Sequence, residues 1–273
     1  MTDLDTGTDH LLARIEQGVG VLTFNRPERR NALSGAMLDA LGRLLARFER
    51  DDDVRCVLLT GAGGAFCAGG DVKQMAGDGE PAAPPVSYEE LVLRQRRRHR
   101  ETSGRLFAMG KPTVAALPGP AAGAGLSLAL ACDLRYAATS AFLTSAFARV
   151  GFSGDYGGSY FLSHLVGTAR ARELYFLSDR ITATEAERLG IVNAVFPDDE
   201  LEAAALARAR RLAAGPAVAY RYMKENLNRA ISAGLADCLD LEATHHLHTA
   251  TTADHLEAVR AFVEHREPVF EGR

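Results

Sequence analysis

The feature that most constrains the fold is one stretch, Lys111 to Tyr136, which reads KPTVAALPGPAAGAGLSLALACDLRY. Its apolar run from Val114 to Leu117 ends at Pro118-Gly119-Pro120, which is the pattern of a buried strand stopped by a turn. A small-residue segment then leads into an apolar run from Leu126 to Cys132, which predicts a helix buried on all sides. Amides in the first turn of a helix have no helical partner, and the helix dipole favours negative charge beside them. The stretch therefore predicts a site at the mouth of a buried helix that polarises an oxygen atom.

The same order of strand, glycine-rich turn and helix entry occurs earlier in the chain. Val54 to Thr60 reads as a buried strand, Gly61 to Gly64 as a turn, and a helix is expected to start at Asp71. The two segments share organisation rather than letters, so they predict a weak internal repeat. A third glycine-rich bend, Ser153 to Gly158, precedes a helix expected from about Ser159.

The pattern of elements changes near residue 197. Mixed strands and helices are expected before it and only helices after it, so we expect an α/β core over residues 1–197 and a helical region over 198–273. The core is expected to contain a helix capped by Ser34, a loop over Ala76 to Val86 and one helix from Ser87 to about Met109. Asp133 is expected to pair with Arg135, and Asp254 to cap the last helix.

Composition excludes several kinds of partner. The formal net charge is −4, so neither nucleic acid nor a membrane surface is expected as a partner. No apolar run reaches the roughly 18 residues of a membrane span, and the first residues lack the pattern of a signal peptide. The four cysteines form no CxxC pair, which is typical of reduced thiols, so we expect a cytoplasmic protein. The histidines around His246 lack the spacing of a metal site, and no metal or redox cofactor is expected.

Two glycine-rich helix entries can place two backbone amides on one carbonyl oxygen, which is the arrangement of an oxyanion hole. The segments AFCAGGDVKQM, PAAGAGLSLALACD and GDYGGSYFL are specific when taken together. With them, the sequence resembles the enoyl-CoA hydratase/isomerase (crotonase) family over nearly the whole chain, from Asn25 to the segment that begins at Phe262. The resemblance implies an α/β spiral of repeated ββα units with a C-terminal helical region that trimerises, and members often pair trimers into hexamers. It also implies an acyl-CoA substrate, whose thioester enolate is stabilised by two backbone amides.

The resemblance also assigns residues. The two amides would belong to Gly70 and Ala124. Phe262 and His265 hold the tail positions that reach the CoA of a neighbouring subunit, with histidine where lysine is usual, which weakens one contact. The CoA belongs to the substrate, so it is not counted as a cofactor. The contacts to its adenine and pantetheine would fall on Arg26, Ala32, Ala68, Asp71, Val72 and Lys73.

The sequence departs from the family where hydratases carry two catalytic glutamates. Ser127 stands at the first position and Phe147 at the second, or Ala146 if one gap is placed differently. None of these side chains can move a proton near neutral pH, so two-glutamate hydration is not expected. Ser127 and Phe147 are candidates for substrate contact instead, although Ser127 also fits a core serine bonded back to its own helix.

Asp155 remains as the candidate acid/base. Its Asp-x-Gly-Gly bend resembles that of isomerase-like relatives of the phenylacetate-pathway type, in which this aspartate is the lone acid/base. One carboxylate between apolar walls can carry a proton between two carbons of an enolate, which is all that double-bond migration needs. We therefore expect an enoyl-CoA isomerase.

Three alternatives stay open. Asp155 can instead cap the helix that starts near Gly157. The protein can be an enoyl-CoA hydratase of fatty-acid, aromatic or sterol side-chain catabolism that activates water with Asp155 or with a loop acid such as Glu89. It can also bind CoA thioesters without chemistry. The letters of the chain do not fix the acyl group.

Overall fold

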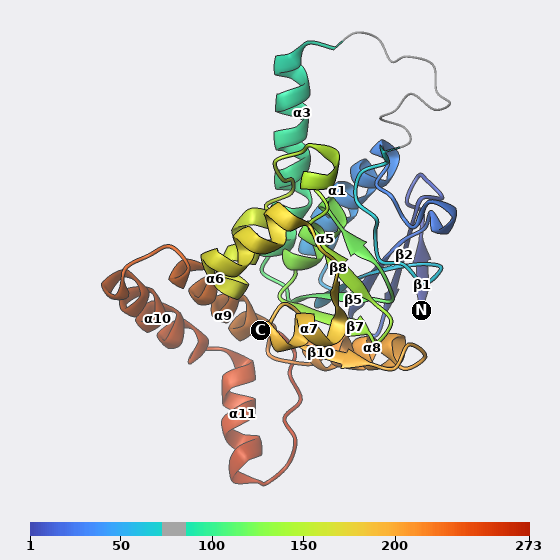
Figure 1. Cartoon of the computed structure of the whole chain (residues 1–273). Coiled ribbons are helices and arrows are strands. Elements are labelled where there is room, and N and C mark those ends of the chain that lie inside the picture. Colours follow the sequence, from blue (N-terminus) through green and yellow to red (C-terminus); the bar gives the residue numbers. More distant parts are fainter. Residues whose placement is uncertain (73–85) are drawn as a thin grey trace.

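The computed structural model describes residues 1–72 and 86–273, which form a two-sheet α/β core with helices projecting from its C-terminal end (Figure 1). Lys73 and residues 76–85 of the expected loop lie outside the described residues. Within the described part, no helix combines the length and the apolar character that crossing a membrane would require.

The larger sheet has seven strands among the described residues. Neighbours from β3 to β10 run parallel, whereas β1, β2 and β3 are antiparallel, so the chain enters the sheet through a meander and continues by crossovers. The confirmed strand from Val114 to Leu117 lies in the interior of the sheet, between β4 and β7, with all its side chains buried. In spatial order the strands are β1 (Thr2–Leu4), β2 (Leu11–Glu16), β3 (Val19–Phe24), β4 (Cys56–Gly61), β5 (Thr113–Leu117), β7 (Leu134–Ala138) and β10 (Ala194–Phe196).

A smaller sheet completes the repeat that the sequence predicted. It consists of β6 (Ala121–Ala122), β8 (Phe142–Thr144) and β9 (Ile181–Thr182), and Cys67 extends it by a bridge to Ala121. In successive units the first strand joins the large sheet, the second joins the small sheet, and a helix follows, as in β5–β6–α5 (Ala124–Leu130) and β7–β8–α6 (Gly158–Leu177). The expected spiral of ββα units is therefore confirmed.

The helices of the core follow the predicted signals with one exception. Ser34 caps α1 by accepting a hydrogen bond from the amide of Met37. The single helix expected from Ser87 to Met109 is wrong, because Thr102 has φ −114° and ψ −90°, which divides it into α3 and α4. Among the described residues, the core helices are η1 (Pro27–Arg29), α1 (Gly35–Arg50), α3 (Tyr88–Glu101), α4 (Ser103–Ala108), α5 (Ala124–Leu130), η2 (Ala148–Val150), α6 (Gly158–Leu177, bent at Gly167) and α7 (Ala183–Arg188).

The described residues after 197 contain helices and no strand, as predicted. The first of these helices packs on the large sheet, and α10 and α11 project away from the core (Figure 1). The sequence predicted that Asp254 caps the last helix, and this is wrong. Thr252 is the cap and accepts a hydrogen bond from the amide of His255, whereas Asp254 accepts from the amides of Glu271 and Gly272 in the C-terminal tail. The helices are α8 (Leu201–Ala213), α9 (Ala217–Ala230), α10 (Leu235–Thr249) and α11 (Ala253–Val263).

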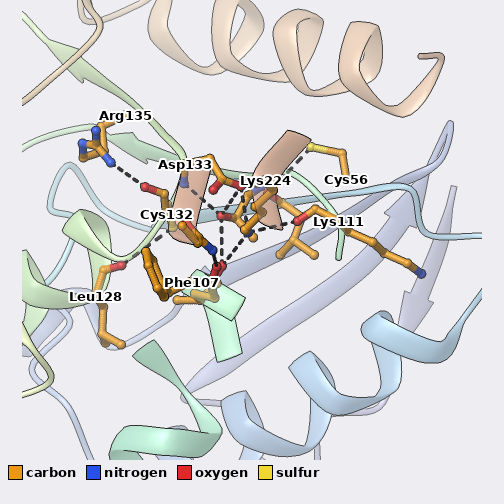
Figure 2. Close-up of polar contacts among 12 residues, drawn as sticks. Cys56, Phe107, Lys111, Leu128, Cys132, Asp133, Arg135 and Lys224 are labelled. Atoms are coloured by element: carbon orange, nitrogen blue, oxygen red, sulfur yellow. Dashed lines mark hydrogen bonds and ion pairs between the residues drawn. The ribbon is translucent and has the colours of Figure 1, made fainter. Parts of the chain in front are cut away.

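An ion pair between buried Lys224 and half-buried Asp133 fastens α9 to the core (Figure 2). Lys224 donates to Asp133 and to the carbonyl oxygen of Leu106, each at 2.9 Å. The expected pairing of Asp133 with Arg135 is wrong, because Arg135 donates to backbone carbonyls, including that of Ile191 at 2.6 Å. The lysine therefore holds the helical extension on the core through charge and backbone acceptors together.

Candidate active site

The two glycine-rich helix entries meet at one end of the core. The bridge between Cys67 and Ala121 joins their segments, and the Ala122 amide donates to the Cys67 carbonyl at 2.9 Å. Gly69 has φ +89°, and a Cβ there would lie 2.8 Å from the Ala122 carbonyl oxygen and 3.4 Å from the Ala124 nitrogen. A side chain at this position would separate the two segments, so glycine is required for the close approach.

Both predicted oxyanion residues line a single pocket of about 290 Å³. Ala124 is the first residue of α5, so its amide lies in the turn that has no helical acceptor. Within residues 1–72 and 86–273, neither the Gly70 nor the Ala124 amide has a hydrogen-bond acceptor. Two free amides in one pocket satisfy the first requirement of an oxyanion hole.

The rest of the pocket wall is largely apolar, with the carboxylates of Asp71 and Asp155 among its polar groups. Leu33, Leu38, Phe147, Val150 and Phe152 supply apolar surface. Phe147 is buried and stacks on Tyr175, with the ring centroids 5.9 Å apart. This wall suits an acyl chain, and it contains Phe147, which the sequence indicated as a candidate for substrate contact.

Asp155 lines the same pocket as the free amides of Gly70 and Ala124. It does not cap α6, which begins after Gly157 without a side-chain cap. Apolar walls stand beside Asp155, as expected, but its carboxylate also accepts hydrogen bonds from Gln95, from His99 and from the amide of Tyr156. The site thus combines two amide donors with one hydrogen-bonded carboxylate.

Gln95 and His99 are the residues at this site that the sequence analysis missed. Both lie on α3 within the arginine-rich segment from Arg94 to Arg100, which the letters alone show as a solvated helix face. The available signal was their i, i+4 spacing, which places a glutamine and a histidine on one face of the helix. Nothing in that spacing identified Asp155 as their partner.

Two tyrosines lie beside the carboxylate. Burial, with a further contribution from the charge of Asp155, raises the pKa of Tyr175 to about 12 and also raises the pKa of Tyr156. The buried Tyr175 hydroxyl has no hydrogen-bond partner among the described residues. Both phenols therefore stay protonated at neutral pH and are poor bases for substrate chemistry.

Ser127 lies outside the residues that line the pocket. Its hydroxyl donates to the carbonyl of Gly123 at 3.2 Å, as expected for a core serine, and its side chain is 1% exposed. A Cβ on Gly158 would meet the Ser127 hydroxyl at 2.3 Å, so α6 packs directly over this position. The side chain that replaces the first hydratase glutamate is thus enclosed by the protein.

Some of the residues expected to contact CoA line the pocket, and others lie outside it. Ala68, Asp71 and Val72 line the pocket. Arg26 lies behind them, donating to the carboxylate of Asp71 at 3.1 Å and to the carbonyl of Ala32 at 2.7 Å.

Phe262 lies on α11 and His265 follows it, and neither residue lines the pocket. Phe262 is 82% exposed.

Among residues 1–72 and 86–273, no group of three or more His, Cys, Asp or Glu side chains is placed to hold a metal ion.

Comparison with known proteins gives consistent results. A family model described as "Enoyl-CoA hydratase/isomerase" matches residues 14–273. The chain is 37% identical over 265 residues to 1,2-epoxyphenylacetyl-CoA isomerase of Escherichia coli, covering 97% of this chain and 99% of the relative. It is 38% identical over 259 residues to a Rhodobacter capsulatus protein named "Probable enoyl-CoA hydratase", covering 95% and 96%. The crystal structure of enoyl-CoA hydratase from Bacillus anthracis superimposes with a TM-score of 0.88 at 33% identity, covering 97% of this chain and 100% of that one.

Proposed function

Because the chain belongs to the enoyl-CoA hydratase/isomerase (crotonase) family and has its fold, we propose that it is an enoyl-CoA double-bond isomerase with Asp155 as acid/base. The family makes it an acyl-CoA enzyme, whereas a relative named as an isomerase and one named as a probable hydratase are about equally similar, at 37% and 38% identity. The observation that carries the proposal is that Asp155 lies in the pocket of the two free amides and, unlike Asp71 in the same pocket, forms no ion pair with an arginine among the described residues. Ser127 and Phe147, at the positions where the resemblance places the hydratase glutamates, support it.

The proposed reaction uses the amides and the carboxylate in sequence. The amides of Gly70 and Ala124 donate to the thioester oxygen of a bound 3-enoyl-CoA. Asp155 removes a proton from C2, and the electron pair is delocalised onto the thioester oxygen as an enolate. The same carboxyl group returns the proton to C4, which moves the double bond from C3–C4 to C2–C3. No water is added and no redox cofactor is consumed.

The charges of the pocket favour migration over hydration. Among its described lining residues, Asp71 and Asp155 carry the carboxylates. Asp71 pairs with Arg26 at 3.1 Å and with Arg29 at 3.7 Å, and its side chain is 7% exposed. An aspartate held between two arginines is a weak base, so it does not replace the second glutamate that hydration would use.

Binding of CoA and assembly complete the proposal. We assign the pantetheine and adenine contacts to Ala68, Val72 and Lys73, with Arg26 holding Asp71 in place beside Ala32.

The helical region over residues 198–273 is proposed to form a trimer, or a dimer of trimers, in which Phe262 and His265 approach the CoA of a neighbouring subunit. Its exposed apolar side chains, among them Leu227 and Leu235 at 70% and 76%, support an interface there. We place the enzyme in the cytoplasm.

The test follows hydrogen and water by mass spectrometry. A six-carbon 3-enoyl-CoA and its 2-enoyl isomer are each incubated with the enzyme in deuterated water. Conversion of the 3-enoyl ester without gain of water supports the proposal, and water gained by the 2-enoyl ester supports the hydratase instead. Asp155→Asn should lower isomerase turnover about 100-fold or more, whereas the exposed control Asp199→Asn should not change it. Unchanged turnover in Asp155→Asn would remove the assignment.

A further inference from the structure

We propose that His99 is a positioning residue that determines which oxygen of Asp155 takes the substrate proton. The proposal rests on the acid/base role of Asp155 and makes it specific to one atom. His99 acts through Asp155, because Gln95, Asp155 and Tyr156 line the pocket whereas His99 is absent from its wall.

The two oxygens of Asp155 have unequal surroundings. Oδ1 is contacted by His99 Nε2, by Gln95 Nε2 at 3.0 Å and by the amide of Tyr156 at 3.1 Å. Oδ2 accepts only from Gln95, at 2.9 Å, among the described residues. A carboxylate oxygen offers about two lone-pair directions, so Oδ1 is fully occupied and Oδ2 keeps capacity for a proton.

His99 is the side chain that makes this difference. Gln95 donates to both oxygens at nearly equal distances, so it holds the carboxylate without distinguishing Oδ1 from Oδ2. The Tyr156 amide belongs to the next residue along the chain and travels with Asp155. His99 contacts Oδ1 from a different element, 56 residues away, and therefore fixes the rotation of the carboxyl group relative to the pocket.

The imidazole is itself held in place. Its ring packs against Tyr156, with centroids 4.5 Å apart, and Gln95 Nε2 lies 3.1 Å from its Nε2. A side chain supported in this way can impose an orientation on its partner, because little rotamer freedom remains to be lost. The pair His99–Asp155 thus supplies a preoriented base, which is the condition for efficient proton transfer.

Two substitutions at position 99 separate positioning from general packing. His99→Phe keeps an aromatic ring against Tyr156 and removes the donor, whereas His99→Gln keeps a donor nitrogen near the place of Nε2. The test measures kcat and KM for the six-carbon 3-enoyl-CoA, together with Tm. The control is His164→Gln, an exposed histidine on α6 that lies outside the pocket wall.

We expect His99→Phe to lower kcat about 10- to 100-fold with KM changed less than about threefold, because the lost bond is to a charged acceptor. His99→Gln should recover kcat to within about fivefold of the wild type. A crystal structure of His99→Phe should show the Asp155 carboxyl group rotated, and His164→Gln should match the wild type throughout.

The outcomes separate the two proposals. Wild-type kcat in His99→Phe, alongside an inactive Asp155→Asn, overturns the positioning role and leaves the isomerase intact. An equal loss in the Phe and Gln variants also overturns it. An active Asp155→Asn removes the base assignment. In every case an unrotated Asp155 carboxyl group in the His99→Phe crystal overturns the role of His99 as the orienting residue.

Discussion

Replacing Gly125 with alanine is expected to disable the oxyanion site without changing any ionisable group. Gly125 is the second residue of α5, directly after the amide of Ala124. A Cβ there would lie 2.4 Å from the carbonyl oxygen of Cys67, 2.6 Å from its Cβ and 2.7 Å from its sulfur, whereas ordinary contact begins at 3.4 Å. The start of α5 must therefore move away from the segment that carries Gly70 by about 1 Å.

That displacement is large compared with what an oxyanion hole tolerates. Its donors act at about 2.7–3.1 Å from the charged oxygen, and losing one donor costs about 10²–10³ in kcat. Gly125→Ala should therefore lower kcat by about that factor. The overpacked core should also lose about 1–3 kcal/mol of the free energy of unfolding. Trimming Cys67 to alanine should not restore activity, because the nearest clashing atom belongs to the backbone.

The assay is steady-state isomerisation of the 3-enoyl-CoA, performed well below the Tm of the variant so that only folded enzyme is compared. The control is Gly234→Ala, because nothing lies within 4 Å of an added Cβ at that position and its φ is −78°. A folded Gly125→Ala enzyme with wild-type kcat, or one altered only in KM, would refute the claim that the spacing of the two helix entries carries the chemistry.

Three further predictions concern stability and reactivity. Lys224→Met should lower the free energy of unfolding in urea by about 1–3 kcal/mol, because it leaves the half-buried carboxylate of Asp133 without its charged partner; a loss below about 0.5 kcal/mol would contradict this. In native protein about one cysteine per chain, half-buried Cys238, should react with Ellman's reagent at pH 8. The other three cysteines are buried, and burial raises the pKa of Cys67, for example, to about 12. Rapid reaction of more than one cysteine per chain would be inconsistent with this. Hydrogen bonds from Arg266 lower the pKa of Glu257 to about 2, so the stabilisation from this contact is complete above pH 4.5 and disappears as the pH falls toward 2. The difference in Tm between the wild type and Glu257→Gln should therefore shrink from pH 4.5 to pH 2. A difference that stays constant would argue against a stabilising role of the contact.

The sequence by itself determined the parts of this protein that depend on local patterns. The apolar run before Pro118 and the small residues before Leu126 specified a buried strand, a turn and a buried helix, and all three are present. Ser34 could be recognised as a cap because capping joins residues three positions apart. The letters also predict that Ser127 and Phe147 stand where the resemblance places the hydratase glutamates, because residue identity within a motif can be read directly from the sequence.

Only the tertiary structure decided which side chains meet. Asp155 lies 56 and 60 residues from its partners His99 and Gln95, and the charge of Asp133 is met by a lysine 91 residues away rather than by its neighbour Arg135. Helical periodicity states which residues share a face, but it does not state what that face will touch. Such pairings arise when several elements pack together, because burial then removes water as the alternative partner and each polar group must find its acceptor or donor across the fold.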